Sequence, residues 1–249
     1  MSTLLLRLAA PLQSWGSNSK FDTRYTDAAP TKSGVIGMLA CAMGIDREAP
    51  LDWLANIKYG VRIDQPGELL VDFHMVHEHS TSKNASAWVT RRHYLADAVF
   101  VVALEADEGK MMQLQEALQR PVFPIYLGRR SCPPVGRLVL GIEQDSLREC
   151  LKKYPYQGGE YYLRKMKKRG NQVTAEILRD AEELENGYIT KDVPLSFSQV
   201  HRQYGYRQVV RDFIPLADIS DVFSKLLQEK NTEHDPMGFW EDEDVFIKD

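Results

Sequence analysis

Two strand-then-helix patterns dominate the first 142 residues of the chain. The apolar run at residues 4–8 predicts a buried strand, and apolar residues at helical spacing predict a helix from Ser33 to Gly44. A β-branched and aromatic run at 97–104 predicts another strand, followed by a helix over 109–119. A strand that leads into a helix twice restricts the fold to mixed helix and sheet architectures.

Shorter strand-forming runs complete this pattern at residues 58–63, 69–76 and 137–142. The resulting order of elements predicts an α+β fold: a ferredoxin-like (RRM-like) domain over residues 1–145. The polar tip Ser80 to Ser86 lies between two flanks that can pair, so we expect an inserted β-hairpin at about residues 74–96.

The second half of the chain has a different composition. Ser146 and Glu149 form a capping box, after which Tyr, Gly and Lys become frequent and three further strands are predicted. We therefore expect a smaller β-rich domain over residues 146–215. An amphipathic helical pattern then leads into an acidic tail, and the two together span residues 216–249.

The net charge of −4 argues against a nucleic-acid-binding protein only when it is taken as an average. Residues 228–249 contain eight acidic and two basic residues, a local charge of −6, which leaves +2 for the first 227 residues. Three cysteines without C-x-x-C spacing favour a reducing compartment, and the apolar run at the N-terminus is too short for a membrane span. We expect a cytoplasmic protein that does not contact a membrane.

A basic loop is the first candidate binding site. Tyr126-Leu-Gly-Arg-Arg-Ser-Cys-Pro-Pro134 combines Arg129 and Arg130 with a glycine, an aromatic residue and a proline pair, and residues 120–137 contain four bases and no acids. Arginine forks suit phosphate oxygens, and their faces stack on bases. A solvated surface loop is the alternative.

The start of the first helix is the second candidate. Lys32, Ser33 and Gly34 follow Pro30-Thr31, and Arg24 lies nearby in the sequence, so backbone N–H groups, the helix dipole and a lysine are predicted to converge on an anion. The spacing is not that of a Walker A loop, which argues against a nucleotide triphosphatase. An ordinary helix capped by Thr31 or Ser33 is the alternative.

A third basic region covers residues 164–169, with five bases in six positions. It lies near aromatic residues that can stack on bases, namely Tyr156, Tyr161 and Tyr162. The alternative is a solvated hairpin tip.

Histidines raise two further possibilities, a metal site and acid–base catalysis. On a strand, His77 and His79 share a face and His74 points the other way, so zinc would lack a third local ligand and we expect no metal and no cofactor. A metal-independent ribonuclease that uses a histidine or tyrosine base and a lysine remains the alternative function. The residues that suit it are His93, His201, Tyr204 and Lys32.

Three segments in order, LLLRLAAPLQSWG, PTKSGVIGMLACAMGI and PVFPIYLGRRSCPPVG, resemble the CasD family of subunits from Cascade, the type I-E CRISPR surveillance complex. These belong to the repeat-associated RNA-binding proteins. The resemblance covers about 85% of the chain and excludes the 164–169 cluster and the acidic tail.

This resemblance implies a non-catalytic RNA-binding subunit with a ferredoxin-like core, a hairpin thumb and a small C-terminal β domain. Such a subunit grips the 5′ handle of CRISPR RNA and caps the backbone filament in antiviral defence. The implied partners are CRISPR RNA, the backbone subunit CasC, the large subunit CasA and, through the guide, target DNA.

Carried over by motif, the resemblance also implies which residues contact RNA. The basic loop would contribute Arg129, Arg130 and Ser131, the helix start Lys32, Ser33 and Gly34, and the N-terminal motifs Arg24 and, more weakly, Trp15. On the thumb, the implied RNA contacts are Trp88, Arg91, Arg92 and His93.

Overall fold

A large antiparallel sheet forms the centre of the molecule. The computed structural model describes residues 1–16, 22–77, 87–170 and 173–228. The sheet has seven strands in the order β10-β11-β9-β4-β7-β1-β8. Its strands are β1 Ser2–Ala9, β4 Lys58–Gln65, β7 Val99–Ala106, β8 Val139–Glu143, β9 Thr174–Asp180, β10 Tyr188–Ser196 and β11 Gln203–Pro215.

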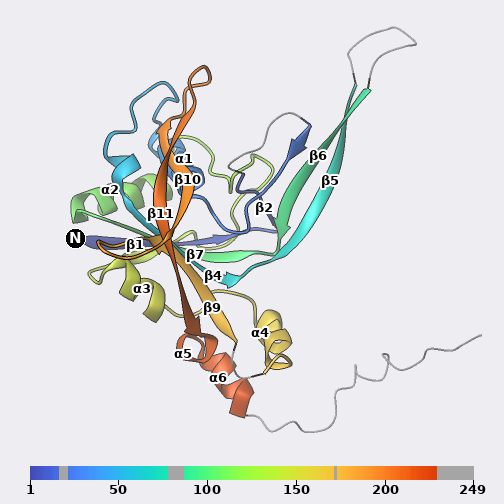
Figure 1. Ribbon diagram of the computed structural model, residues 1–249, viewed down its shortest axis with the longest axis vertical. Coiled ribbons are helices and arrows are strands. Elements are labelled where there is room, and N and C mark those ends of the chain that lie inside the picture. Colours follow the sequence, from blue (N-terminus) through green and yellow to red (C-terminus); the bar gives the residue numbers. More distant parts are fainter. Residues whose placement is uncertain (17–21, 78–86, 171–172, 229–249) are drawn as a thin grey trace, which may run out of the picture.

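Helices cover both faces of this sheet (Figure 1). They are α1 Lys32–Met43, α2 Glu108–Gln119, α3 Leu147–Lys153, α4 Glu160–Lys167, α5 Leu216–Ile219 and α6 Asp221–Gln228, with a short 3-10 helix η1 at Asp52–Asn56. None of these helices has the length and apolar character that a membrane span requires. The mixture of helices with a large antiparallel sheet agrees with the predicted α+β class.

The neighbouring interior strands β1 and β7 are apolar because both of their faces are covered. Leu4 lies opposite Leu104 across the pair, and Leu8 lies opposite Phe100. Leu4 and Leu8 pack in a core with residues of α1 and α2, whereas Leu5 packs in a second core with residues of α3 and α4. Successive side chains of a strand point to opposite faces, so an uninterrupted apolar run supplies both cores. Each fully buried leucine contributes about 1.5–3 kcal/mol.

Local sequence signals set the ends of α1. Thr31 is the N-cap, and its side-chain oxygen accepts the N–H of Gly34 at 3.2 Å. At the other end Gly44 has φ +73° and donates its N–H to the carbonyl oxygen of Cys41 at 3.2 Å. A left-handed residue at this position favours glycine, which confirms the predicted end of the helix.

A long hairpin extends from the body of the molecule (Figure 1). Its strands are β5 (Glu68–His77) and β6 (Ala87–Ala96), paired from Glu68 opposite Ala96 to His77 opposite Ala87. The pairing therefore starts six residues before the hairpin boundary expected near residue 74. The strand expected at 69–76 forms one side of this arm, because a strand-forming pattern does not say which strand it will pair with. The expected tip at 80–86 lies outside the described residues.

Strands of the second half extend the same sheet. β9 pairs with β4, with Val61 opposite Leu178, and β11 then pairs with β9. The boundary predicted near residue 145 thus falls between strands that share one sheet, and the division of the chain into domains stays a prediction. The cluster at 164–169 begins in α4 and not in a hairpin tip.

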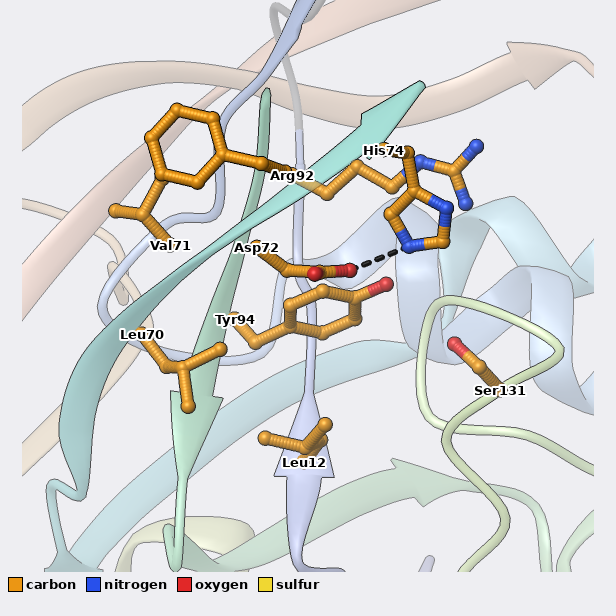
Figure 2. Close-up of a pocket in the computed structure, with 9 residues that line it drawn as sticks. Leu12, Leu70, Val71, Asp72, His74, Arg92, Tyr94 and Ser131 are labelled. Carbon is orange, nitrogen blue, oxygen red and sulfur yellow. Dashed lines mark ion pairs between the residues drawn. The ribbon is translucent and has the colours of Figure 1, made fainter. Parts of the chain in front are cut away.

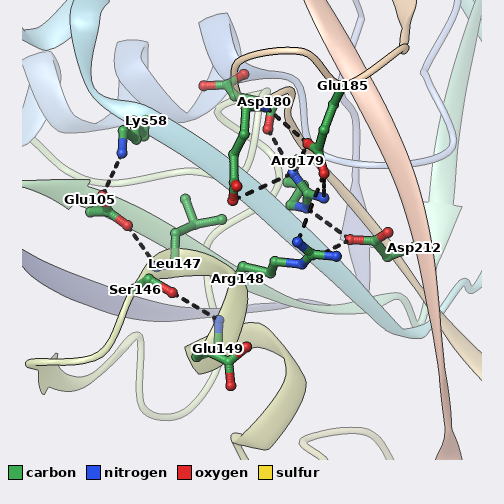
Figure 3. Close-up of polar contacts among 11 residues, drawn as sticks. Lys58, Glu105, Ser146, Leu147, Arg148, Glu149, Arg179, Asp180, Glu185 and Asp212 are labelled. Carbon is green, nitrogen blue, oxygen red and sulfur yellow. Dashed lines mark hydrogen bonds and ion pairs between the residues drawn. The ribbon is translucent and has the colours of Figure 1, made fainter.

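Charged side chains attach α3 to the sheet (Figure 3). Glu105 accepts the N–H of Leu147 at 2.7 Å, at the first turn of α3, and pairs with Lys58 at 2.8 Å. Burial raises the pKa of the Glu105 carboxyl, but these two donors lower it further, so it stays below its ordinary value. The acid is therefore held in its charged form where α3 begins.

Candidate nucleic-acid interface

The basic loop at residues 126–133 is closed on itself and anchored in the core. Leu127 and Cys132 are buried, and the N–H of Leu127 donates to the Cys132 carbonyl oxygen at 2.7 Å. Between these anchors the chain exposes Arg130 and Ser131, while Arg129 is half-buried. A loop pinned at both ends presents its cationic side chains with little further loss of conformational entropy.

The loop also packs closely against the segment that follows β1. The N–H of Ser14 donates to the Leu127 carbonyl oxygen at 3.2 Å, and Gly128 has φ +85°. Such a backbone angle is strained for residues with a Cβ atom. Gly128 therefore allows the turn that leaves Arg130 exposed and places Arg129 against Tyr94.

Arg129 connects the loop to two other parts of the chain. Its Nη2 donates to the Arg24 carbonyl oxygen at 2.9 Å, and its guanidinium lies 4.6 Å from the centre of the Tyr94 ring. Its Nη1 is buried and has no hydrogen-bond partner among the described residues. A buried donor without a partner costs free energy. An acceptor on a bound molecule that pairs with this Nη1 would remove that cost.

The neighbouring side chains of the basic loop change the pKa of the Tyr94 phenol. Burial alone would raise the pKa of its phenol, but hydrogen bonds with Ser131 and Arg129 and the charge of Arg129 lower the pKa below its ordinary value overall. The ring and the two loop residues thus form one polar cluster.

Further arginines lie beside this cluster at the base of the hairpin. β3 (Thr23–Arg24) pairs in parallel with β6, which places Arg24 opposite Arg92 and Thr23 opposite Arg91. The Arg91 guanidinium lies 5.7 Å from the centre of the Phe73 ring. The Nε of Arg92 is buried without a partner among residues that the structure describes.

Aromatic rings accompany these charges. The Tyr25 and His93 rings are 4.9 Å apart, and Tyr25 is 60% exposed. The Nδ1 of His93 is buried and lacks a partner within the described part of the chain. Trp88 lies farther out on β6, half exposed, opposite Val76.

A pocket of about 660 Å³ opens where the hairpin meets the loop. Figure 2 shows Tyr94 between the hairpin strand and the loop that carries Ser131. An ion pair between Asp72 and His74 forms another part of the wall. The pocket is lined by Leu12, Leu70, Val71, Asp72, Phe73, His74, Arg92, Tyr94 and Ser131.

This arrangement suits a flexible anionic strand with flat rings. Arginines and aromatic rings lie on both faces of the hairpin base, Arg92 with Tyr94 on one face and Arg91 with His93 on the other. Among the described residues, three buried polar atoms of this region have no hydrogen-bond partner. Arginine and aromatic faces stack on bases, and guanidinium donors bind phosphate oxygens.

The predicted anion site at the start of α1 contains an internal carboxylate. Asp192 accepts the N–H of Lys32 at 2.8 Å, and the Lys32 amine pairs with Asp180 at 3.1 Å. Lys32 and Ser33 are buried, and Gly34 is half-buried. This differs from the open phosphate site expected there, because β9 and β10 bring acids to the helix mouth.

Arg207 completes this buried network. Its Nε donates to Asp192 at 2.6 Å, and its Nη1 donates to Asp180 at 2.8 Å. Burial lowers the pKa of the Arg207 guanidinium, but the two carboxylates raise it further, so the side chain is held charged. The charges at the start of α1 therefore balance one another internally.

Trp15 is also a core residue in the structure. It is 1% exposed, its Nε1 donates to the Gln13 side chain at 3.1 Å, and its ring lies against Gly34. Its burial leaves no face for the nucleic-acid contact that its motif implied.

The histidines considered for a metal site or for RNA cleavage do not form a cluster among the described residues. Within the described ranges no group of three metal-binding side chains occurs. His74 pairs with Asp72, His77 ends β5, and His79 lies outside the described residues. Of the ribonuclease candidates, His93 lies on β6, His201 precedes β11 and Tyr204 lies on it, and Lys32 is held by acids.

Sequence reasoning missed Tyr94, Phe73 and Tyr25, which surround the arginines. A signal for Tyr94 was available, because residues two apart on a strand share a face and Tyr94 is two positions after Arg92. The contact between Arg129 and Tyr94 joins positions 35 residues apart, and no local pattern reports it.

Known proteins resemble this chain over most of its length. The model of the family described as CRISPR-associated protein (Cas_Cas5) matches residues 3–210. The "CRISPR system Cascade subunit CasD" of Escherichia coli (strain K12) is 36% identical over 183 residues, which cover 65% of this chain and 80% of that protein.

Two solved structures resemble the chain in fold as well as in sequence. A chain of a "CRISPR RNA-guided surveillance complex" has a TM-score of 0.69 and 32% identity, covering 91% of this chain and 100% of that chain. A second structure, described as "Crystal structure of Cas protein", has a TM-score of 0.67 and 35% identity, covering 88% and 97%.

Proposed function

The chain belongs to the Cas5 family of CRISPR-associated proteins, and from this premise we propose that it is the surveillance-complex subunit that holds the 5′ handle of CRISPR RNA. The proposal depends above all on one observation, the position of Arg129. Its guanidinium lies over Tyr94, donates to the Arg24 carbonyl and keeps one buried donor without a partner among the described residues.

Handle RNA would lie along the loop and the base of the hairpin. Arg129, Arg130 and Ser131 would contact phosphates. Arg24 of β3 and Arg92 of β6 would lie beside them, because β3 pairs with β6 and the Arg24 carbonyl accepts from Arg129. Arg91, His93 and Trp88 would follow the strand outward along β6. The pocket beneath Tyr94 would take an apolar ring face together with polar base edges.

Lys32, Ser33 and Gly34 are not part of this proposal. Asp180 and Asp192 already satisfy the lysine and the helix N-terminus, so a phosphate would have to displace two buried carboxylates.

We further propose that the core is ferredoxin-like. β8, β1, β7 and β4 are neighbours in the sheet, α1 connects β1 to β4, and α2 connects β7 to β8. This order of strands and helices supports that fold.

The hairpin would act as a thumb towards the rest of the complex. Its apolar side chains are largely exposed, among them Leu69, Phe73, Met75, Trp88 and Val89. Assembly with the backbone subunit CasC and the large subunit CasA would cover such residues, and target DNA would be reached through the guide. Patches of this kind mark interaction surfaces.

The proposed role is non-catalytic. Metal-independent cleavage of precursor RNA is the alternative, and the observation that favours it is the buried Nδ1 of His93, which has no hydrogen-bond partner among the residues that the structure describes. Purified protein incubated with labelled repeat RNA in chelator should leave the RNA intact. Specific cleavage that is lost in His93→Ala would establish the ribonuclease instead.

The decisive experiment removes two charges from the loop. Arg129→Ala/Arg130→Ala should weaken binding of repeat-handle RNA and lower the salt slope by about 0.7 for each lost phosphate contact. Lys152→Ala/Lys153→Ala, at the end of α3, removes the same charge and should retain wild-type binding. Handle affinity and salt slope that match wild type in the loop variant would contradict the proposal.

A further inference from the structure

An acidic side chain lies in the pocket between the hairpin and the basic loop. Asp72 is on β5, opposite Arg92 of β6, and it lines the pocket together with Tyr94 (Figure 2). A carboxylate repels the phosphate oxygens of a nucleic acid, because both carry negative charge. Asp72 can therefore contact bound RNA only where the strand offers an N–H or O–H donor.

Stability of the hairpin accounts for little of this acid. The Oδ2 atom of Asp72 pairs with Nε2 of His74, two residues along the same strand. Both side chains are partly exposed, 39% for Asp72 and 45% for His74. Ion pairs at such exposure contribute little to the free energy of folding. The effect of the histidine is instead to hold one oxygen of the carboxylate in place.

The second carboxylate oxygen is open to a bound molecule. Oδ1 of Asp72 makes no hydrogen bond or ion pair with any residue that the structure describes. Arg92 lines the same pocket, and its buried Nε has no partner in the described part of the chain. The pocket volume of about 660 Å³ lies within the range of roughly 300–1,000 Å³ that is typical of small-molecule sites. The pocket thus offers an acceptor, a donor and an aromatic ring to a single base.

The four RNA bases differ in how they meet a carboxylate. Guanine carries two adjacent donors on its Watson–Crick edge, N1–H and N2–H, and they form a fork like the one that arginine offers to a carboxylate. The amino groups of adenine and cytosine each lie beside a ring nitrogen acceptor, and the N3–H of uracil lies between two carbonyl oxygens. In those three bases a neighbouring lone pair repels the second carboxylate oxygen. Guanine also presents O6, an acceptor for the donors of Arg92.

We propose that Asp72 selects guanine at one position of the bound RNA, with its carboxylate on the N1–H and N2–H donors and the base against the Tyr94 ring. Leu12 and Leu70 line the apolar side of the same pocket and exclude water from the base. His74 is a positioning residue, because it acts through Asp72. This inference rests on the proposed function, since it names the base that the handle site takes.

The test replaces each guanine of the repeat-handle RNA in turn by inosine, which keeps O6 and N1–H and lacks only the 2-amino group. At one position, binding to wild type should fall about tenfold. Asp72→Asn should bind the guanine and inosine RNAs with nearly equal affinity there, because an amide has only one acceptor oxygen. Glu68→Gln, on the same strand and outside the pocket, removes the same charge and should keep the wild-type ratio.

Inosine without effect at any position would overturn the inference, and so would a ratio that Asp72→Asn leaves unchanged or a handle that contains no guanine. Single 2′-deoxy substitutions form a second arm. A loss there that Asp72→Asn abolishes, without an inosine effect, would assign the carboxylate to a ribose hydroxyl and overturn the selection of guanine.

The loop variant separates this inference from the proposed function. Arg129→Ala/Arg130→Ala should weaken binding of every handle RNA and keep the ratio of guanine to inosine affinity. Wild type that binds no handle RNA would contradict the proposed function and this inference together, whereas binding without guanine discrimination would contradict only the inference.

Discussion

A Cβ atom added to Gly128 would lie 1.7 Å from the carbonyl oxygen of Ser14. The basic loop can approach the segment after β1 only because residue 128 has no side chain. The loop backbone cannot yield easily, since Leu127 and Cys132 anchor it in the core.

Gly128→Ala is therefore expected to displace the loop and weaken handle-RNA binding, since the contact and the left-handed backbone both oppose a side chain. Gly109→Ala is the control, because an added Cβ there meets no atom within 4 Å. Affinity for handle RNA and the unfolding midpoint are measured for both. Wild-type affinity in Gly128→Ala would show that the loop position does not matter.

Tyr94→Leu removes the ring beneath the Arg129 guanidinium. The contact should contribute about 1 kcal/mol, so handle affinity should fall roughly fivefold. Tyr94→Phe keeps the ring, so its affinity for handle RNA should fall by less. Equal losses in the two variants would mean that the hydroxyl, and not the ring face, positions Arg129.

Asp192→Ala leaves the Arg207 guanidinium and the Lys32 N–H without their nearest acceptor in a buried site. We expect the free energy of unfolding to fall by about 3–5 kcal/mol, as when one partner of a buried ion pair is removed. Urea denaturation measures it, with exposed Glu183→Ala as the control. A loss below about 1 kcal/mol would show that the network contributes little.

Glu185 should make stability depend on acid pH. Its hydrogen bonds from Arg179 lower the pKa of its carboxyl to about 2, from an ordinary value of 4.5 (Figure 3). The pKa is depressed in the folded state, so the stabilisation is complete above 4.5 and is lost as pH falls towards 2.

The free energy of unfolding of Glu185→Gln is compared with that of wild type from pH 7 to pH 2. The difference should be largest above pH 5 and should shrink on acidification. Glu183→Gln, on the same turn, should show no such trend. A difference for Glu185→Gln that does not change with pH would contradict this assignment.

The sequence alone specified the elements whose signals are local. Gly44 marks the end of α1, Thr31 is one of the two caps expected at its start, and the apolar runs of β1 and β7 predict strands. The basic loop was also evident from sequence, because Arg129 and Arg130 are neighbours and no acid lies near them along the chain. Capping and alternation involve residues only a few positions apart, so such patterns can be recognised before the fold is known.

Tertiary structure decided which charges remain available. Lys32 has the same local pattern as a phosphate-binding residue, but Asp180 and Asp192, about 150 positions later in the chain, occupy its donors. Arg129 is instead brought against Tyr94, which leaves one of its donors without a partner among the described residues. Whether a cation is neutralised or available depends on which distant acids the sheet brings beside it, and no local pattern contains that information.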